Sequence, residues 1–135
     1  MNRLEGSITA VLSSDALSLV DIDVGGERFS ALVVETPQSN PRLRVGKAVR
    51  ILFKETEVSI AKGLSGGLSC RNRLACTIRA IETSPVLAKL TLDYRGTTVV
   101  SIITTRSAEA LGLQVGDAVE GIVKSNEITI REGDA

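Results

Sequence analysis

The sequence predicts an all-β protein made of two small five-stranded barrels in tandem. Three observations lead to this fold class: an internal repeat, an alternation of apolar and polar residues with period two, and an unusual composition. The chain has 43% hydrophobic residues but only 2% aromatic ones. Its core must therefore come from Val, Ile, Leu and Ala, and the β-branched members of that set favour strands.

The repeat has a spacing of 70 positions and needs no gap. It aligns Asn2-Arg3-Leu4 with Asn72-Arg73-Leu74, and Val45-Gly46 with Val115-Gly116. Further matches reach the end of each copy, where Ile60 falls on Ile130. A duplication explains this pattern. The predicted domains are residues 1–63, a Gly- and Ser-rich linker at 64–68, and residues 69–135.

The alternation predicts the strands of the first copy. Residues 7–12 and 17–24 alternate, Gly25-Gly26 is typical of a hairpin turn, and a third strand follows over 27–34. Two more short strands end the copy. The segment Pro37 to Arg42 contains two prolines and is expected to be a loop.

The second copy repeats this order with one addition. A helical turn is predicted over 107–112, with Ser107 as the N-cap and Gly112 as the C-terminal stop. Five short strands with at most one helical turn are typical of an OB-like Greek-key barrel. Barrels of about 60 residues have small cores, so oligomers are expected. The strands are predicted at 74–82, 87–94, 97–104, 118–124 and 127–131.

The charge and the cysteines exclude several classes of protein. Sixteen basic and sixteen acidic residues cancel, and only 2% of residues are aromatic, which argues against binding nucleic acid through this chain. No apolar run is long enough for a membrane span and no signal segment begins the chain, so a cytoplasmic protein is expected. Cys70 and Cys76 match no metal or redox spacing, and without any His they are interpreted as reduced packing residues.

Three segments of the second copy are rich in hydrogen-bond donors and come at strand ends. Each segment taken alone has a structural explanation at least as good as a ligand site. The first can be a solvated junction between domains, the second a helix cap, and the third a solvent-exposed turn. Together they predict a site for an oxyanion, because hydroxyls, backbone N–H groups and an Arg or Lys can surround a negative charge. The candidate residues are Ser69, Cys70, Arg71 and Asn72 in the first segment, Thr104 and Ser107 in the second, and Lys124 and Ser125 in the third.

The first copy loses these donors together. Met1 stands where the second copy has Arg71, and Glu55 stands where it has Ser125. A carboxylate at Glu55 would repel an oxyanion. We therefore expect one copy that binds the ligand and one degenerate, structural copy.

The motifs Ser-x-Arg-Asn-x-Leu at 69–74 and Val-Lys-Ser at 123–125, with Leu-Gly-Leu-x-x-Gly at 111–116, resemble the Mop/TOBE (molbindin-like) unit. That unit occurs in molbindins, in molybdate-responsive transcription regulators and in molybdate-transporter ATPases. The resemblance covers nearly the whole chain as a tandem pair. One departure is Cys70, where the family more often has Ala; another is the absence of Ser-x-Arg ahead of Asn2.

The resemblance implies non-catalytic binding of molybdate or tungstate, with no organic cofactor and no metal bound except as the oxyanion. It implies a homo-oligomer, dimer or trimer, with ligand at subunit interfaces. Storage, sensing and an accessory role in a transporter remain open, as does a DNA-binding domain upstream of the sequence. The other readings are an OB-fold nucleic-acid binder and an enzyme. Against an enzyme, the sequence has no His, no nucleophile beside a base and no phosphate loop.

Overall fold

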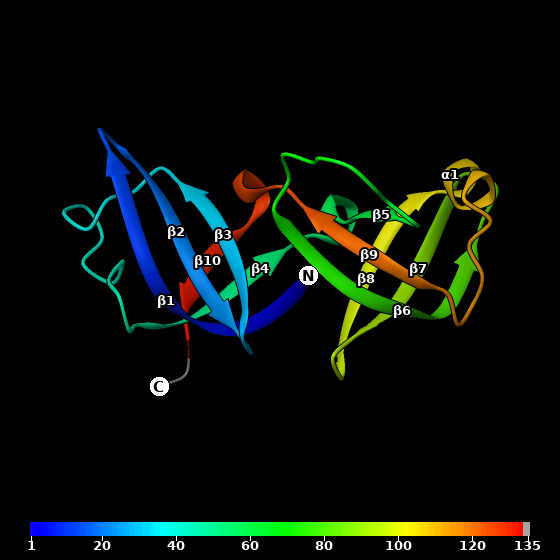
Figure 1. Cartoon of the computed structure of the whole chain (residues 1–135), viewed down its shortest axis with the longest axis horizontal. Helices are drawn as coiled ribbons and strands as arrows, with labels where there is room; N and C mark the ends of the chain where they lie inside the picture. The colour runs from blue at the N-terminus through cyan, green and yellow to red at the C-terminus, as the bar shows by residue number, and fades with distance from the viewer. Residues whose placement is uncertain (134–135) are drawn as a thin grey trace. The chain divides into compact units, whose positions relative to one another are not determined.

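The computed structural model describes residues 1–133 and consists mainly of antiparallel β-sheet (Figure 1). There are two five-stranded sheets, with strand orders β10-β4-β1-β2-β3 and β5-β9-β6-β7-β8. This confirms the predicted fold class. The strands are β1 (Asn2–Ser14), β2 (Leu17–Val24), β3 (Glu27–Val33), β4 (Ala48–Phe53), β5 (Ser59–Ala61), β6 (Asn72–Thr83), β7 (Leu87–Tyr94), β8 (Thr97–Thr104), β9 (Ala118–Val123) and β10 (Thr129–Glu132).

The two copies exchange their last strands. β5 belongs to the first copy in sequence but pairs with β9, with Ser59 opposite Ile122. β10 belongs to the second copy but pairs with β4, with Thr129 opposite Leu52. Among the described residues, the compact units are therefore Met1 with residues 3–53 and 124–133 (unit 1), and Asn2 with residues 54–123 (unit 2).

The predicted boundaries, 1–63, 64–68 and 69–135, mark the two copies in the sequence, but they do not mark these units. Residues 134 and 135 of the second predicted domain lie outside the described residues. The period-two pattern could not reveal the exchange, because the exchanged strands carry equivalent apolar residues, Ile60 and Ile130.

Each unit has its own apolar core, and the two cores fill their space differently. In unit 1 the large side chains Phe29 and Phe53 are almost fully buried. The repeat-related positions in unit 2 are Val99 and Val123, which are also fully buried. Tyr94 is buried in unit 2 where the first copy has Val24, so a large residue at one position offsets smaller ones at others.

The hairpin turns follow the sequence expectation. Gly25 and Gly26 have φ values of 59° and 93°, the left-handed conformation that a tight hairpin turn between twisted strands requires. Arg95 and Gly96 take the same places in the second copy, at 51° and 90°. The segment from Pro37 to Arg42 contains turns and no helix, as predicted.

The helical elements differ from the prediction in two respects. Helix α1 (Thr105–Ala110) begins earlier than expected, because Thr104 and not Ser107 is its N-cap. Short 3-10 turns, η1 (Glu55–Glu57) and η2 (Ser125–Glu127), connect the last two strands of each copy. The second copy therefore has two helical turns, and Glu127 lies in a turn instead of the predicted strand.

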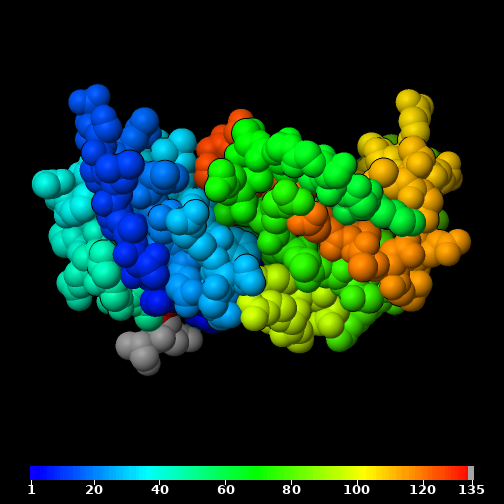
Figure 2. Space-filling model, viewed as in Figure 1, coloured from blue at the N-terminus to red at the C-terminus, as the bar shows by residue number. Residues whose placement is uncertain are grey.

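The segment that leads into the linker is held in place by Lys62. Lys62 Nζ donates to the carbonyl oxygen of Gly112 at 3.1 Å and to Asp117 Oδ2 at 2.9 Å. In Figure 2 this green segment lies beside the orange segment that leads into β9. Within residues 1–133, no helix is long and apolar enough to cross a membrane.

Candidate functional site

Two of the predicted donor segments adjoin the same end of the β6–β9 pair: one precedes β6, and the other begins at Lys124, which follows β9 and is the first residue of the last stretch of unit 1. Asn72, the first residue of β6, pairs with Val123, the last residue of β9. The side chain of Asn72 is 1% exposed, and its Nδ2 donates to the carbonyl oxygen of Val123 at 3.0 Å. Because the strands are antiparallel, Arg71 before Asn72 and Lys124 after Val123 emerge together.

The donors at this end are not committed to other groups. Ser69, Arg71 and Lys124 are exposed, and Ser125 is half-buried. Among residues 1–133, the side chains of these four make no hydrogen bond or ion pair. Two cations and two hydroxyls are therefore available to an anion at this end of β6 and β9. The fifth residue of the group, Cys70, is half-buried between Ser69 and Arg71.

The turn that carries Lys124 and Ser125 is held by a carboxylate. The backbone N–H of Lys124 donates to Glu127 Oε1 at 3.3 Å, and the N–H of Glu127 donates to the carbonyl oxygen of Lys124 at 2.9 Å. The first copy builds the same turn, with Lys54 N–H donating to Glu57 Oε1 at 2.8 Å. The spacing of Lys and Glu thus has a structural cause in both copies. The two turns differ at the positions between them, with Ser125 against Glu55 and Asn126 against Thr56.

A neighbouring arginine is already paired. Arg73 donates to Glu120 through Nε and through Nη2, at 2.7 and 2.6 Å. The hydrogen bond from Arg73 is the main cause that lowers the pKa of the Glu120 carboxyl, and the reciprocal bond raises the pKa of Arg73. Of the two arginines of this segment, Arg71 is the one available to a ligand.

Thr104 and Ser107 lie away from these donors within one chain. Thr104 is opposite Leu87 at the start of β7, and Ala88 is opposite Thr83 at the end of β6. The two hydroxyls therefore lie toward the end of β6 opposite to Asn72. The first and last of the 12 residues of β6 are eleven steps of about 3.3 Å apart, or roughly 36 Å of strand.

Their hydroxyls serve the start of α1. Thr104 Oγ1 accepts from the N–H of Ser107 at 3.1 Å and lies 2.8 Å from its hydroxyl. Thr104 also lines a pocket of about 320 Å³ with Pro85, Val86 and Arg106. Within one chain the segment with Thr104 and Ser107 therefore lies apart from the other two, because sequence showed that each lies at a strand end but not at which end of the sheet.

The role of the repeated asparagine was missed by the sequence reasoning. Asn2 is also buried, and its Nδ2 donates to the carbonyl oxygen of Val100 at 2.8 Å while its Oδ1 accepts from the N–H of Val100 at 2.8 Å. The side-chain amide of Asn2 thus makes the two hydrogen bonds to Val100 that the backbone of a neighbouring strand would make. The signal was present, since both copies keep Asn while the residues before it differ.

The described residues provide no metal centre. Within residues 1–133 no three His, Cys, Asp or Glu side chains are grouped so that they could hold a metal ion. Cys76 is buried, and burial raises the pKa of its thiol to about 11. It is therefore a neutral packing residue at neutral pH.

Comparison with known proteins finds a matching domain family and a similar solved structure. The model of the TOBE domain family matches residues 68–130. A solved structure of the cytoplasmic molybdate-binding protein ModG, with molybdate bound, matches 98% of this chain and 96% of its own at 30% identity and a TM-score of 0.88.

Three curated relatives match nearly the whole chain. They are the molybdenum import ATP-binding protein ModC of Brucella abortus (34% identity, 90% of this chain, 32% of the relative), the molybdenum-pterin-binding protein MopB of Rhodobacter capsulatus (29%, 91% and 47%) and the molybdenum transport protein ModE of Azotobacter vinelandii (28%, 96% and 48%). The chain spans about a third of ModC and about half of the other two. With its two five-stranded units and these matches, the chain belongs to the tandem Mop/TOBE, molbindin-like domain family.

Proposed function

We propose that the chain binds molybdate or tungstate without catalysis, and that Ser69, Cys70, Arg71, Lys124 and Ser125 supply its donors. The observation that carries this proposal is the register of β6 and β9, which brings two uncommitted cations to the same sheet end. The likeness to a structure that holds molybdate supports the choice of ligand.

Within this site the residues have different tasks. Arg71 and Lys124 offset the two negative charges of the anion, and the hydroxyls of Ser69 and Ser125 donate hydrogen bonds. Asn72 is a positioning residue, because its buried amide holds the carbonyl of Val123 and fixes where the next residue leaves the sheet. Cys70 contributes through its backbone, since a thiol is a weak donor.

The site is completed by a second chain. Ser69, Arg71 and Lys124 are exposed, so these donors alone leave a bound dianion largely in water. Covering the site with another copy would strengthen each hydrogen bond by excluding water. A homo-oligomer with ligand at its interfaces follows from this argument.

The cellular role that fits is cytoplasmic storage or sensing of the oxyanion. The likeness to cytoplasmic ModG over almost all of both chains supports a role that needs only these two units. A transporter accessory domain has support from the 34% identity to ModC, of which the chain spans 32%. A nucleic-acid contact through this chain has none, given the balanced charge.

Calorimetric titration with molybdate, tungstate, sulfate and phosphate tests the ligand. We expect heat and saturation with the first two and much weaker binding of sulfate and phosphate. Equal affinity for sulfate, or no heat with any of the four anions, would show that the proposal is wrong.

Substitutions then test the site. Arg71→Ala and Lys124→Ala each remove a charge-assisted contact of roughly 1.5–3 kcal/mol, which corresponds to about a 10- to 150-fold rise in Kd. The matched control is Lys54→Ala, because Lys54 occupies the place of Lys124 in the first copy and starts the same kind of turn. A loss of affinity in Lys54→Ala as large as in Lys124→Ala would contradict the single-copy site.

The assembly is tested by dilution. A ligand that binds only the assembled native state adds RT ln(1 + [L]/Kd), about 2.7 kcal/mol at a hundredfold excess over Kd. Tm should therefore rise with oxyanion and with protein concentration. Sedimentation and thermal melts at several dilutions measure both. A monomer with full affinity and a concentration-independent Tm would show that one chain makes the whole site.

A further inference from the structure

The exchanged strands end in charged residues of opposite sign. Lys62 follows β5, and Glu132 is the last residue of β10; the repeat of 70 positions makes them equivalent. Lys62 Nζ lies 2.9 Å from Asp117 Oδ2 in unit 2. Glu132 lies 3.7 Å from Lys47 Nζ in unit 1.

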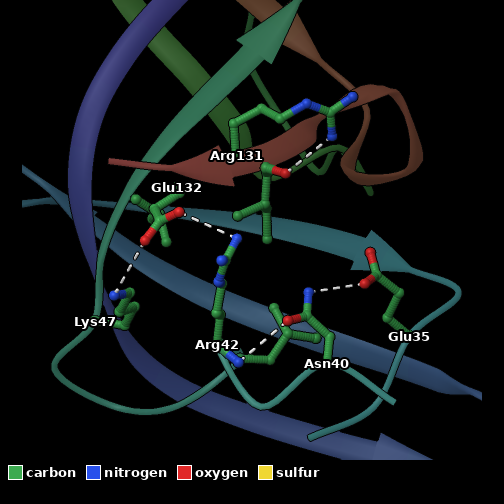
Figure 3. A pocket seen from close by; sticks show the side chains of 9 residues that line it. Glu35, Asn40, Arg42, Lys47, Arg131 and Glu132 are labelled. Carbon is green, nitrogen blue, oxygen red and sulfur yellow. Dashed lines mark hydrogen bonds and ion pairs between the residues drawn. The ribbon is translucent and has the colours of Figure 1, made fainter. Parts of the chain in front are cut away.

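The residues that pair with these two ends, called the acceptor residues below, also occupy equivalent positions in the repeat and also have opposite charges. Asp117 in the second copy corresponds to Lys47 in the first. Each exchanged end makes a second contact, again at equivalent positions. Lys62 bonds the carbonyl oxygen of Gly112, and Glu132 Oε2 lies 3.1 Å from Arg42 Nη1. In Figure 3 Glu132 lies between Lys47 and Arg42, at the rim of a pocket of about 180 Å³.

From this reversal we infer that the two charge pairs direct each last strand into the other copy's sheet. If β5 closed the sheet of its own copy, Lys62 would take the place of Glu132 and face Lys47 and Arg42. If β10 did the same, Glu132 would face Asp117. Both self-closed sheets would thus bring like charges together, whereas both exchanged sheets join opposite charges.

One cross-strand contact has the opposite preference. Arg131 is opposite Arg50 in the exchanged sheet, and in a self-closed sheet it would be opposite Glu120. The charges of Arg50 and Glu120 are already balanced within their own units. Arg50 Nε lies 2.9 Å from Glu5, and Glu120 is paired with Arg73. Arg131 itself is exposed and bonds only the carbonyl of its neighbour Ile130 among the contacts drawn in Figure 3. This contact therefore weighs less than the two reversed pairs.

Ile60 and Ile130 do not decide between the two arrangements, because both are half-buried at equivalent positions. The buried residues just before the strands, Val58 and Ile128, differ by one methylene group, and this packing difference is the same in every variant compared below. The exchanged ends are partly exposed, with side-chain exposures of 37% for Lys62 and 49% for Glu132. Each pair of such exposure shifts an equilibrium by at most roughly fivefold. Reversal at both ends, from attraction to repulsion, should shift the balance on the order of tens of fold.

A competition between two disulfides in the full chain measures the balance. The reporter carries Leu52→Cys, Ser59→Cys and Thr129→Cys. It also carries Arg42→Ala, so that Lys47 is the remaining partner of Glu132 and its reversal changes the sign of the whole contact. In the exchanged sheet position 52 is opposite position 129, whereas in a self-closed sheet it would be opposite position 59. Opposite residues in antiparallel strands are about 4.5–5.5 Å apart, within reach of a disulfide. Peptide mass mapping of the monomer after oxidation identifies which bond formed and separates it from Cys70 and Cys76.

Two variants of this reporter carry the same net charge as the parent. The first, Lys47→Glu with Asp117→Lys, reverses both acceptors and should shift the disulfide ratio toward 52–59 by tens of fold. The second adds Lys62→Glu and Glu132→Lys, which restores opposite charges in the exchanged sheet and should restore the 52–129 bond. Arg131→Ala is the control and should leave the ratio unchanged.

Each outcome bears on the inference. An unchanged ratio in the acceptor-reversed variant would overturn it, as would a failure of the fourfold variant to recover the parental ratio. If the acceptor-reversed variant does not fold, Tm replaces the ratio as the readout. Recovery of the parental Tm in the fourfold variant would then support the inference, and a Tm that stays low would overturn it.

Discussion

Ser101→Ala should destabilise the protein through a single buried hydrogen bond. Ser101 is fully buried on β8, and its hydroxyl donates to the carbonyl oxygen of Val58 at 2.6 Å. Val58 immediately precedes β5, so this bond anchors the exchanged strand in unit 2. The first copy has Ala31 at the equivalent place, which shows that the sheet accommodates alanine there without a steric cost.

The magnitude follows from what the substitution leaves behind. An alanine removes the donor and leaves the carbonyl of Val58 buried without it, at a cost of about 1–3 kcal/mol. The entropy of unfolding is about 2.1 cal/mol/K per residue, or about 0.28 kcal/mol/K for 135 residues. Tm should therefore fall by about 4 to 11 °C.

Calorimetry and urea titration of Ser101→Ala measure this loss, with Ser84→Ala as the matched control. Ser84 also bonds a backbone carbonyl, that of Leu87 at 3.1 Å, but it is exposed, so its loss should cost less than about 0.5 kcal/mol. Hydrogen exchange should accelerate at the amides of β5. If Ser101→Ala melts at the same temperature as Ser84→Ala, the anchoring role assigned to this hydroxyl is wrong.

Three further predictions concern other parts of the chain. Gly6→Ala should lower Tm strongly, because a Cβ at position 6 would lie 2.5 Å from the backbone oxygen of Asp23; a melt of the variant checks this. A thiol reagent at pH 8 should modify half-buried Cys70 long before buried Cys76, whose pKa is about 11, and mass spectrometry of partly modified protein gives the order. Because the hydrogen bond from its arginine partner lowers the pKa of Glu120 below 4.5, the stability it contributes is present above pH 4.5 and lost as pH falls through its folded pKa. Glu120→Gln should therefore be less stable than the parent at pH 7 in urea titrations, and the difference should shrink below pH 4.5.

The strands were predictable from sequence because each has one buried face and one exposed face. β2, for example, alternates as expected for residues 17–24, and its hairpin glycines fix where it ends. The cap of α1 was less certain, since Thr104 and Ser107 are both good capping residues and only their mutual bond settles which one starts the helix. Local patterns thus gave most elements to within two residues, but β1 begins five residues before the strand predicted at 7–12, and the two 3-10 turns were not predicted.

The candidate site was predictable only in part, for a different reason. That Ser69 to Asn72 and Lys124 share a sheet end depends on the pairing of β6 with β9. That Thr104 lies away from them depends on the pairing of β7 with β8. A strand end has the same local signature at either end of a sheet, so only the register could separate these donors.

The exchange of β5 and β10 also determines when each unit can be finished during synthesis. Unit 1 needs residues 129–132, so it stays open until every other strand of both units has been made. Meanwhile β5 is already present and only 7 positions separate Leu52 from Ser59, against 77 between Leu52 and Thr129. Loop closure alone favours the nearer partner by (3/2)RT ln(77/7), about 2 kcal/mol. A nascent chain can therefore form a local hairpin of β4 and β5 first, and the release of that hairpin would then set the pace of folding.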